Sequence, residues 1–240
     1  KSVLAAPPAW REFSSFASYT HRRFAAGLQR ILIGMGLLSP DAFASVPVLL
    51  DGRAQRATQI VLSAPETNLR RKRFMKGIPN GVSFACYDGY LHPSPWVRSS
   101  MGLARLAQYA IASGIDLLTV TEDNVHFPTE YGQRSAIAVR YLRTLPESSW
   151  GVFSGNLKAD PKTLNITSVV KFEGQIFAHL KFPAGFSSSY SIYSKDMLVK
   201  IASWDPSVLK GVAKIREFAR LASKHSVDSL VARSMSSADG

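Results

Sequence analysis

Cysteine is almost absent from this sequence, since Cys86 is the single one among 240 residues. One thiol cannot form a disulfide framework, nor a cysteine zinc site, within the chain. Such scarcity is typical of a protein from a reducing compartment.

Long apolar runs are absent as well. No stretch reaches the roughly 18 apolar residues that a membrane-spanning helix needs, and the longest candidate, Ile31 to Leu38, falls well short. We therefore expect a cytoplasmic protein that is at most peripheral to an inner membrane. The chain begins with Lys1 rather than methionine, so any targeting signal is expected to lie outside it.

Acidic residues are scarce relative to basic ones. The 17 Asp and Glu residues face 29 Lys and Arg residues, which gives a formal net charge of +12. This balance favours an anionic partner, such as nucleic acid, a phospholipid surface or a phosphorylated ligand, although charge also serves solubility alone. A basic nucleic-acid-binding protein is one alternative. Its usual signs, a zinc finger, an RNP-like sequence or a Gly-rich phosphate loop, are missing, so no nucleic-acid partner is expected.

The first 56 residues differ from the rest and are predicted to form an N-terminal helical segment. Their large apolar residues recur mostly every three or four positions, the spacing of an amphipathic helix or helix pair. Two interpretations stay open, because this helix could pack on the main domain or rest on an anionic membrane surface. The apolar positions are Phe13, Phe16, Phe24, Leu28, Ile31, Leu32, Met35 and Leu38, with His21, Arg22, Arg23 and Arg30 between them.

Residues 57–240 are predicted to form one α/β domain in which strands and helices alternate. Short β-branched runs predict strands, and longer periodic stretches predict helices. The alternation favours a parallel sheet covered on both faces. Beyond Gly155 we expect two strands joined at Glu173 and Gly174, then another strand and two helices. The expected strands are 57–63, 81–89, 115–121, 150–155, 166–182 (a pair) and 187–194, and the expected helices are 68–77, 97–114, 129–145, 195–204 and 206–224.

The end of the predicted strand 115–121 carries two carboxylates and an amide, from Glu122, Asp123 and Asn124. Parallel α/β sheets bind their ligands at the carboxyl ends of strands. Oxygen ligands clustered there could hold a hard divalent cation, which in turn could hold a diphosphate. The plainer alternative is that these residues end the strand and cap the following helix. His126 is a further candidate ligand, although a histidine at a strand exit more often has a structural role.

Six motifs, in their order along the chain, resemble those of glycosyltransferase family 25, the lipooligosaccharide and procollagen galactosyltransferases. They lie between Gln59 and Leu198, well over half of the chain. They comprise an Arg-rich helix start after the first strand, an Asp-Gly pair, a helix centred on glycine, the acidic cluster, a tryptophan strand and a Tyr-x-x-Ser strand. The matching segments are IVLSAPETNLRRKRF, FACYDG, SMGLARLAQYA, VTEDNVHF, SWGVFSG and SYSIYSKDML.

The resemblance implies a fold and a function. The fold would be α/β, a GT-A-like, Rossmann-related mixed sheet flanked by helices over residues 57–240, with the N-terminal helical segment before it. The function would be a sugar-nucleotide-dependent glycosyltransferase, inverting, that moves a hexose such as galactose from a UDP-sugar to a glycan or glycolipid acceptor, as in lipopolysaccharide biosynthesis. The basic surface would suit phosphorylated glycolipids at a membrane face.

The resemblance also assigns roles to particular residues. Mn²⁺ or Mg²⁺ would be held by Glu122, Asp123 and Asn124. The nucleotide donor would contact Ser63, Arg70, Arg71, Asp88 and Asp123. An inverting transfer also needs a base for the acceptor hydroxyl, and Asp228, Asp205 and Glu173 are the candidates among which the sequence does not choose.

Plainer interpretations accompany these assignments. The run from Arg70 to Arg73 could be a solvated helix face, and Asp88 could serve only a turn. His179 and His225 are expected to be structural. Trp150, Phe153 and Tyr190 are expected in the core rather than under a sugar.

Three positions depart from the family pattern. Asn124 stands where the family has a second aspartate, Gly151 stands where an aspartate follows the tryptophan, and the Ser-His of the glycine-centred helix is missing near Gln108 and Tyr109. Asparagine is an uncharged and weaker oxygen ligand, so metal dependence is open. A non-catalytic glycosyltransferase-like domain is therefore the second alternative.

The sequence yields one direct prediction. Replacing Asp123 by alanine is expected to abolish turnover of a nucleotide sugar without unfolding the domain, because the carboxylate serves donor binding. A turnover assay beside a circular dichroism melt checks this, and full activity in Asp123→Ala would contradict the site assignment.

Overall fold

The computed structural model describes residues 57–63, 68–88, 95–155, 164–181 and 189–204, with a few positions between 24 and 37. Most of the predicted N-terminal helical segment and the predicted helix 206–224 lie outside these residues, as do Asp205, His225 and Asp228.

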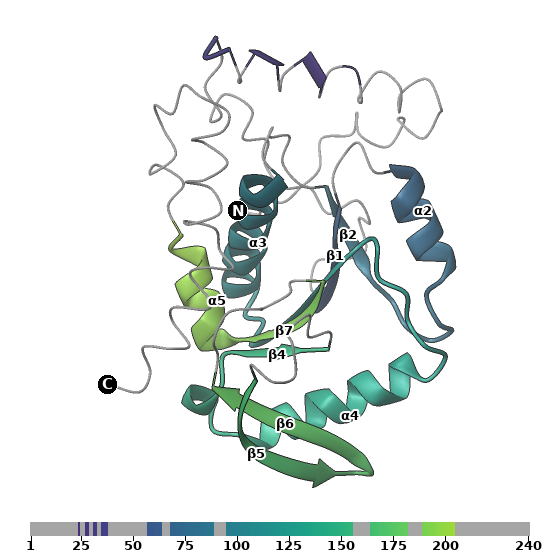
Figure 1. Ribbon diagram of the computed structural model, residues 1–240, viewed down its shortest axis with the longest axis vertical. Coiled ribbons are helices and arrows are strands. Elements are labelled where there is room, and N and C mark those ends of the chain that lie inside the picture. Colours follow the sequence, from purple (N-terminus) through teal and green to yellow (C-terminus); the bar gives the residue numbers. More distant parts are fainter. Residues whose placement is uncertain are drawn as a thin grey trace.

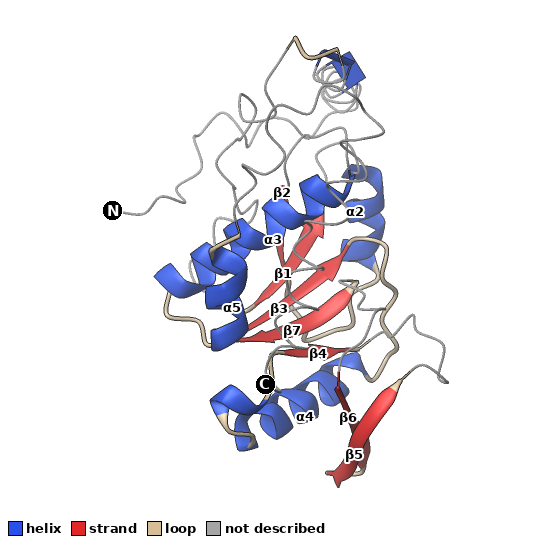
Figure 2. Cartoon of the chain, turned by 60° about the vertical axis from the view of Figure 1, so that its left-hand side comes forward, coloured by secondary structure: helices blue, strands red, loops and turns tan. Residues whose placement is uncertain are grey.

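A five-stranded mixed sheet forms the centre of the described fold, with the strand order β2-β1-β3-β7-β4 (Figures 1 and 2). Strands β1, β2 and β3 run parallel, whereas β7 is antiparallel to both β3 and β4. The α/β class and the mixed sheet that the resemblance implied are confirmed, whereas the parallel sheet that the alternation alone favoured is wrong at β7. That strand follows a hairpin rather than a crossover helix, and parallel neighbours require a crossover. The strand bounds are β1 Gln59–Ser63, β2 Ala85–Asp88, β3 Leu117–Glu122, β4 Val152–Ser154 and β7 Tyr190–Ser194.

Helices cover both faces of this sheet, as predicted (Figure 2). Helices α3, Pro95–Ala112, and α5, Lys195–Ala202, pack side by side on one face. Helix α2, Asn68–Lys76, and the start of α4, Tyr131–Thr144, contribute to the apolar cluster on the other. The first cluster includes Ile60, Tyr87, Leu103, Leu106, Leu118, Tyr193, Met197 and Leu198, and the second includes Val61, Phe74, Phe84, Cys86, Tyr131 and Tyr190.

The division of β1 between these clusters follows from strand geometry, because successive side chains point to opposite faces. Ile60 packs toward α3, and Val61 packs toward α2. Leu62 returns to the α3 side, where a Cβ added at Gly102 would lie only 2.7 Å from its Cδ1. The glycine of the predicted glycine-centred helix therefore has a packing role, since it lets α3 approach β1 closely.

The β5–β6 hairpin, Asn165–Phe172 and Gln175–Lys181, packs beside α4. Its two-residue turn is the predicted one, and Glu173 and Gly174 have φ values of 46° and 80°. Two consecutive positive φ angles match the twist of a tight hairpin. The half-buried side chain of His179 forms a hydrogen bond of 2.5 Å with the Tyr141 hydroxyl, a contact of the kind expected for a structural histidine.

Described positions of the N-terminal segment include helical Phe24, Leu28 and Ile31, which are 71%, 47% and 59% exposed. Within the described part of the chain, no helix has both the length and the apolar character that a membrane crossing demands.

The close approach at Gly102 gives a stability prediction. Gly102→Val places a branched side chain against Leu62, and we expect the free energy of unfolding to fall by about 2 kcal/mol. Ala112→Val, at an exposed position of the same helix, controls for helix propensity and should cost only about 0.5 kcal/mol. Urea denaturation measures both. Equal losses would contradict the packing role.

Candidate functional site

The carboxyl ends of the three parallel strands meet at one edge of the sheet. Ser63 ends β1 and lies in register with Asp88, which ends β2, and Leu62 lies in register with Glu122, which ends β3. The structure thus brings the backbones of these predicted residues together. The side chain of Asp88 is not described.

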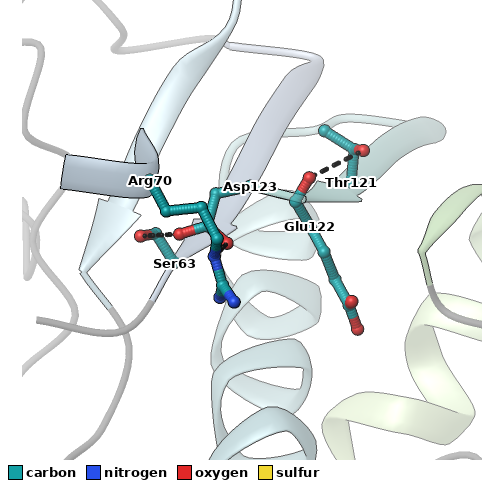
Figure 3. A network of polar contacts seen from close by, with 5 residues as sticks. All are labelled: Ser63, Arg70, Thr121, Glu122 and Asp123. Atoms are coloured by element: carbon teal, nitrogen blue, oxygen red, sulfur yellow. Dashed lines mark hydrogen bonds and ion pairs between the residues drawn. The ribbon is translucent and has the colours of Figure 1, made fainter. Parts of the chain in front are cut away.

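The side chain of Asp123 is the buried centre of this edge (Figure 3). It has no solvent-exposed surface, whereas the side chain of Arg70 is 50% exposed. The Ser63 hydroxyl donates a hydrogen bond of 2.7 Å to Oδ2 of Asp123. Nε of Arg70 lies 2.5 Å from Oδ1 of the same carboxylate. Both carboxylate oxygens are therefore held by partners from β1 and α2.

The start of α2 explains which part of the basic run serves this edge. Arg70 lies in the first turn of the helix and reaches Asp123. Arg71 is buried, whereas Lys72 and Arg73 are exposed. Only part of the basic run from Arg70 to Arg73 faces this edge, as expected. Arg70 is the residue that reaches it, and its side chain is half exposed to solvent.

Glu122 lies on the opposite side of the strand from Asp123. Its register partner Leu62 packs on Gly102 of α3, whereas Asp123 bonds to Ser63 and Arg70 on the α2 side. Figure 3 shows the two acidic side chains pointing apart. This divergence follows from the alternation of side chains along an extended chain.

The predicted metal ligands therefore do not fit a divalent cation in this arrangement. Asp123 has no accessible oxygen, Glu122 points away, and Asn124 is exposed to solvent. Among the residues that the structure describes, no group of three His, Cys, Asp or Glu side chains is placed to hold a metal ion. The exposed His126 does not replace the missing ligand.

Thr121 is a supporting residue that the sequence analysis missed. Its hydroxyl donates a hydrogen bond of 2.8 Å to the carbonyl of Ser189, which also accepts a bond of 3.0 Å from the Glu122 amide. These bonds fasten the end of β3 to the residue before β7. The signal in the sequence was a threonine directly before the acidic residues. Its hydrogen-bond partner lies 68 positions away, so the sequence did not reveal the bond.

Glu173, a predicted base, lies elsewhere. It occupies the hairpin turn and forms an ion pair with two bonds to Arg140 of α4. The hydrogen bond from Arg140 lowers the pKa of Glu173, which makes it a weaker base. The structure does not bring Glu173 to Asp123, and Asp205 and Asp228 lie outside the described residues.

Comparisons with known proteins add no further assignment, since neither the protein-family models nor the curated proteins match this chain.

The burial of Asp123 predicts a structural contribution alongside any functional one. Asp123→Asn keeps the shape but removes the charge that holds Arg70, and we expect a loss of about 2 kcal/mol in unfolding free energy. The loss stays below that of a fully buried pair because Arg70 is half exposed.

The matched control is Asp116→Asn, which removes an exposed ion pair of 3.3 Å with Lys195 and should cost under about 1 kcal/mol. Chemical denaturation compares the two variants. A loss in Asp123→Asn no larger than in the control would contradict the account of the buried carboxylate.

Proposed function

We propose that this chain is a sugar-nucleotide-dependent glycosyltransferase of GT-A type, inverting, that transfers a hexose such as galactose to a glycan or glycolipid acceptor. One observation carries the proposal. A half-exposed arginine is fixed by a buried aspartate at the carboxyl edge of three parallel strands. Nucleotide phosphates bind at that edge in Rossmann-related sheets. The ordered motifs of the sequence support the same assignment.

In this proposal Arg70 holds the donor diphosphate. Its Nε is engaged by Asp123, so the terminal nitrogens of the half-exposed guanidinium are directed away from the carboxylate (Figure 3). A planar guanidinium donates two parallel hydrogen bonds to phosphate oxygens. Because the charge of the leaving diphosphate grows as the sugar departs, a fixed cation there stabilises the transition state.

Arg70 takes the place that Mn²⁺ or Mg²⁺ was expected to hold. The ligand set around Asp123 does not fit a cation, and Asn124 removes one negative charge from the family pattern. The role of base is proposed for Asp205 or Asp228, since Glu173 is occupied by Arg140.

The acceptor side of the proposal rests on charge and exposed apolar residues. A net charge of +12 favours an anionic surface. The exposed Phe24, Leu28 and Ile31 suit a helix lying on a membrane with its apolar residues inserted. We therefore include a glycolipid acceptor at an anionic membrane face.

A non-catalytic glycosyltransferase-like domain is the second candidate. The observation that favours it is the complete engagement of Asp123 by Ser63 and Arg70. Such a domain would bind the nucleotide without turning over the sugar.

A thermal-shift panel of nucleoside diphosphates and their sugar conjugates tests the proposal. One nucleotide is expected to raise the melting temperature by the same amount in EDTA and in manganese. Binding to the folded state by mass action adds about 2.7 kcal/mol to the unfolding free energy when the nucleotide is at a hundredfold excess over Kd. Release of free sugar or transfer to an acceptor then separates the enzyme from the non-catalytic domain. Absence of any nucleotide effect, beside tight salt-sensitive binding to nucleic acid, would overturn the proposal.

A further inference from the structure

A cavity of about 940 Å³ lies at the opposite edge of the sheet from Asp123. Its walls come from the amino ends of β1 and β3, the end of β7 and the inner side of α4. Along the chain, the lining residue Thr119 of β3 lies four residues before Asp123, about 13 Å of extended strand. The volume lies in the range of small-molecule binding sites.

The sheet side of this cavity is polar where a helix-covered face should be apolar. Thr119 is 4% exposed, and Gln59 and Ser194 line the same wall. The carbonyl oxygen of the Gln59 side chain accepts a hydrogen bond from Tyr131, and its amide nitrogen and the Thr119 hydroxyl add donors to this wall. Polar groups that converge on one wall of a cavity suit a polar occupant.

A network of neutral hydroxyls fixes one wall. The Tyr131 hydroxyl donates a bond of 3.1 Å to Oε1 of Gln59 and lies 3.2 Å from the Tyr190 hydroxyl. Ser135 lies 3.3 Å from the same Tyr190 oxygen. Burial raises the pKa of both tyrosines, so they stay uncharged near neutral pH. These bonds hold the amide of Gln59 in a fixed orientation.

The charges at the rim largely compensate one another. Lys195 pairs with Asp116 at 3.3 Å, and Arg140 pairs with Glu173. The half-buried Trp150 lines the cavity as well, whereas the ring of Tyr131 packs against Phe127 and Tyr190. Hydroxyl and amide groups beside one tryptophan, with little net charge, match the hydroxyls and the apolar ring face of a sugar.

We propose that this cavity is a second binding site, which takes an uncharged carbohydrate unit through Thr119, Gln59 and Trp150. The site requires neither a nucleotide nor chemistry at Asp123. Its failure and the failure of the proposed transferase activity are therefore independent.

The test is a titration of the wild-type chain with neutral mono- and disaccharides, followed by saturation-transfer NMR. At least one neutral sugar should bind, and glucuronate or inorganic phosphate should displace it only poorly. Thr119→Val removes one hydroxyl at constant shape and should weaken binding roughly tenfold. Thr129→Val, at an exposed position outside the cavity, is the matched control and should bind as the wild type does.

A second variant keeps the test decisive if Thr119→Val does not fold. Ala136 is exposed at the cavity rim, so Ala136→Trp fills the entrance without touching the core and should abolish sugar binding. Three outcomes would each overturn the proposal. They are the absence of binding by any neutral sugar at millimolar concentration, unchanged binding in Ala136→Trp, and a preference for anionic ligands.

Discussion

The buried carboxylate of Asp123 is the constraint on which the rest of the carboxyl edge depends. A carboxylate without access to water is costly unless hydrogen bonds and an opposite charge compensate it. Ser63 supplies the hydrogen bond from the end of β1, and Arg70 supplies the charge from the first turn of α2. The pair therefore couples the first βα unit to the end of β3. It also holds a guanidinium at the protein surface in one orientation.

The same constraint separates the residues that the sequence places side by side. Once Asp123 points toward α2, the alternation of an extended chain sends Glu122 toward α3. A shared cation site at the three consecutive positions is then geometrically disfavoured, and the proposed function gives its electrostatic role to Arg70. The opposite edge of the sheet is polar for a different reason, since Thr119 and Gln59 face a cavity rather than a packed helix. The two proposals thus assign phosphate to one edge of the sheet and sugar hydroxyls to the other.

Much of the fold was accessible from the sequence, because periodicity is a local property. Helix α4 and the turn of the β5–β6 hairpin lie within two residues of their predicted positions. The mixed character of the sheet was expected from the resemblance alone, since alternation of elements carries no information on the direction of β7. The divergence of Glu122 and Asp123 was missed for a narrower reason. The predicted strand stopped at Thr121, whereas β3 extends to Glu122. The extended backbone at that residue fixes the direction of the Glu122 side chain. The pairing of Arg70 with Asp123 and the cavity under α4 are tertiary features that no local spacing reveals.

The central claim is that Arg70, held by Asp123, binds the donor diphosphate in place of a metal. Isothermal titration of UDP and related nucleoside diphosphates in EDTA tests it most directly, with Arg70→Ala compared against Arg73→Ala, an exposed arginine of the same helix. The account predicts that the wild type and Arg73→Ala bind alike and that Arg70→Ala loses roughly tenfold or more in affinity, as expected for a lost charged hydrogen bond. Unchanged affinity in Arg70→Ala, or binding that appears only with manganese, would contradict it.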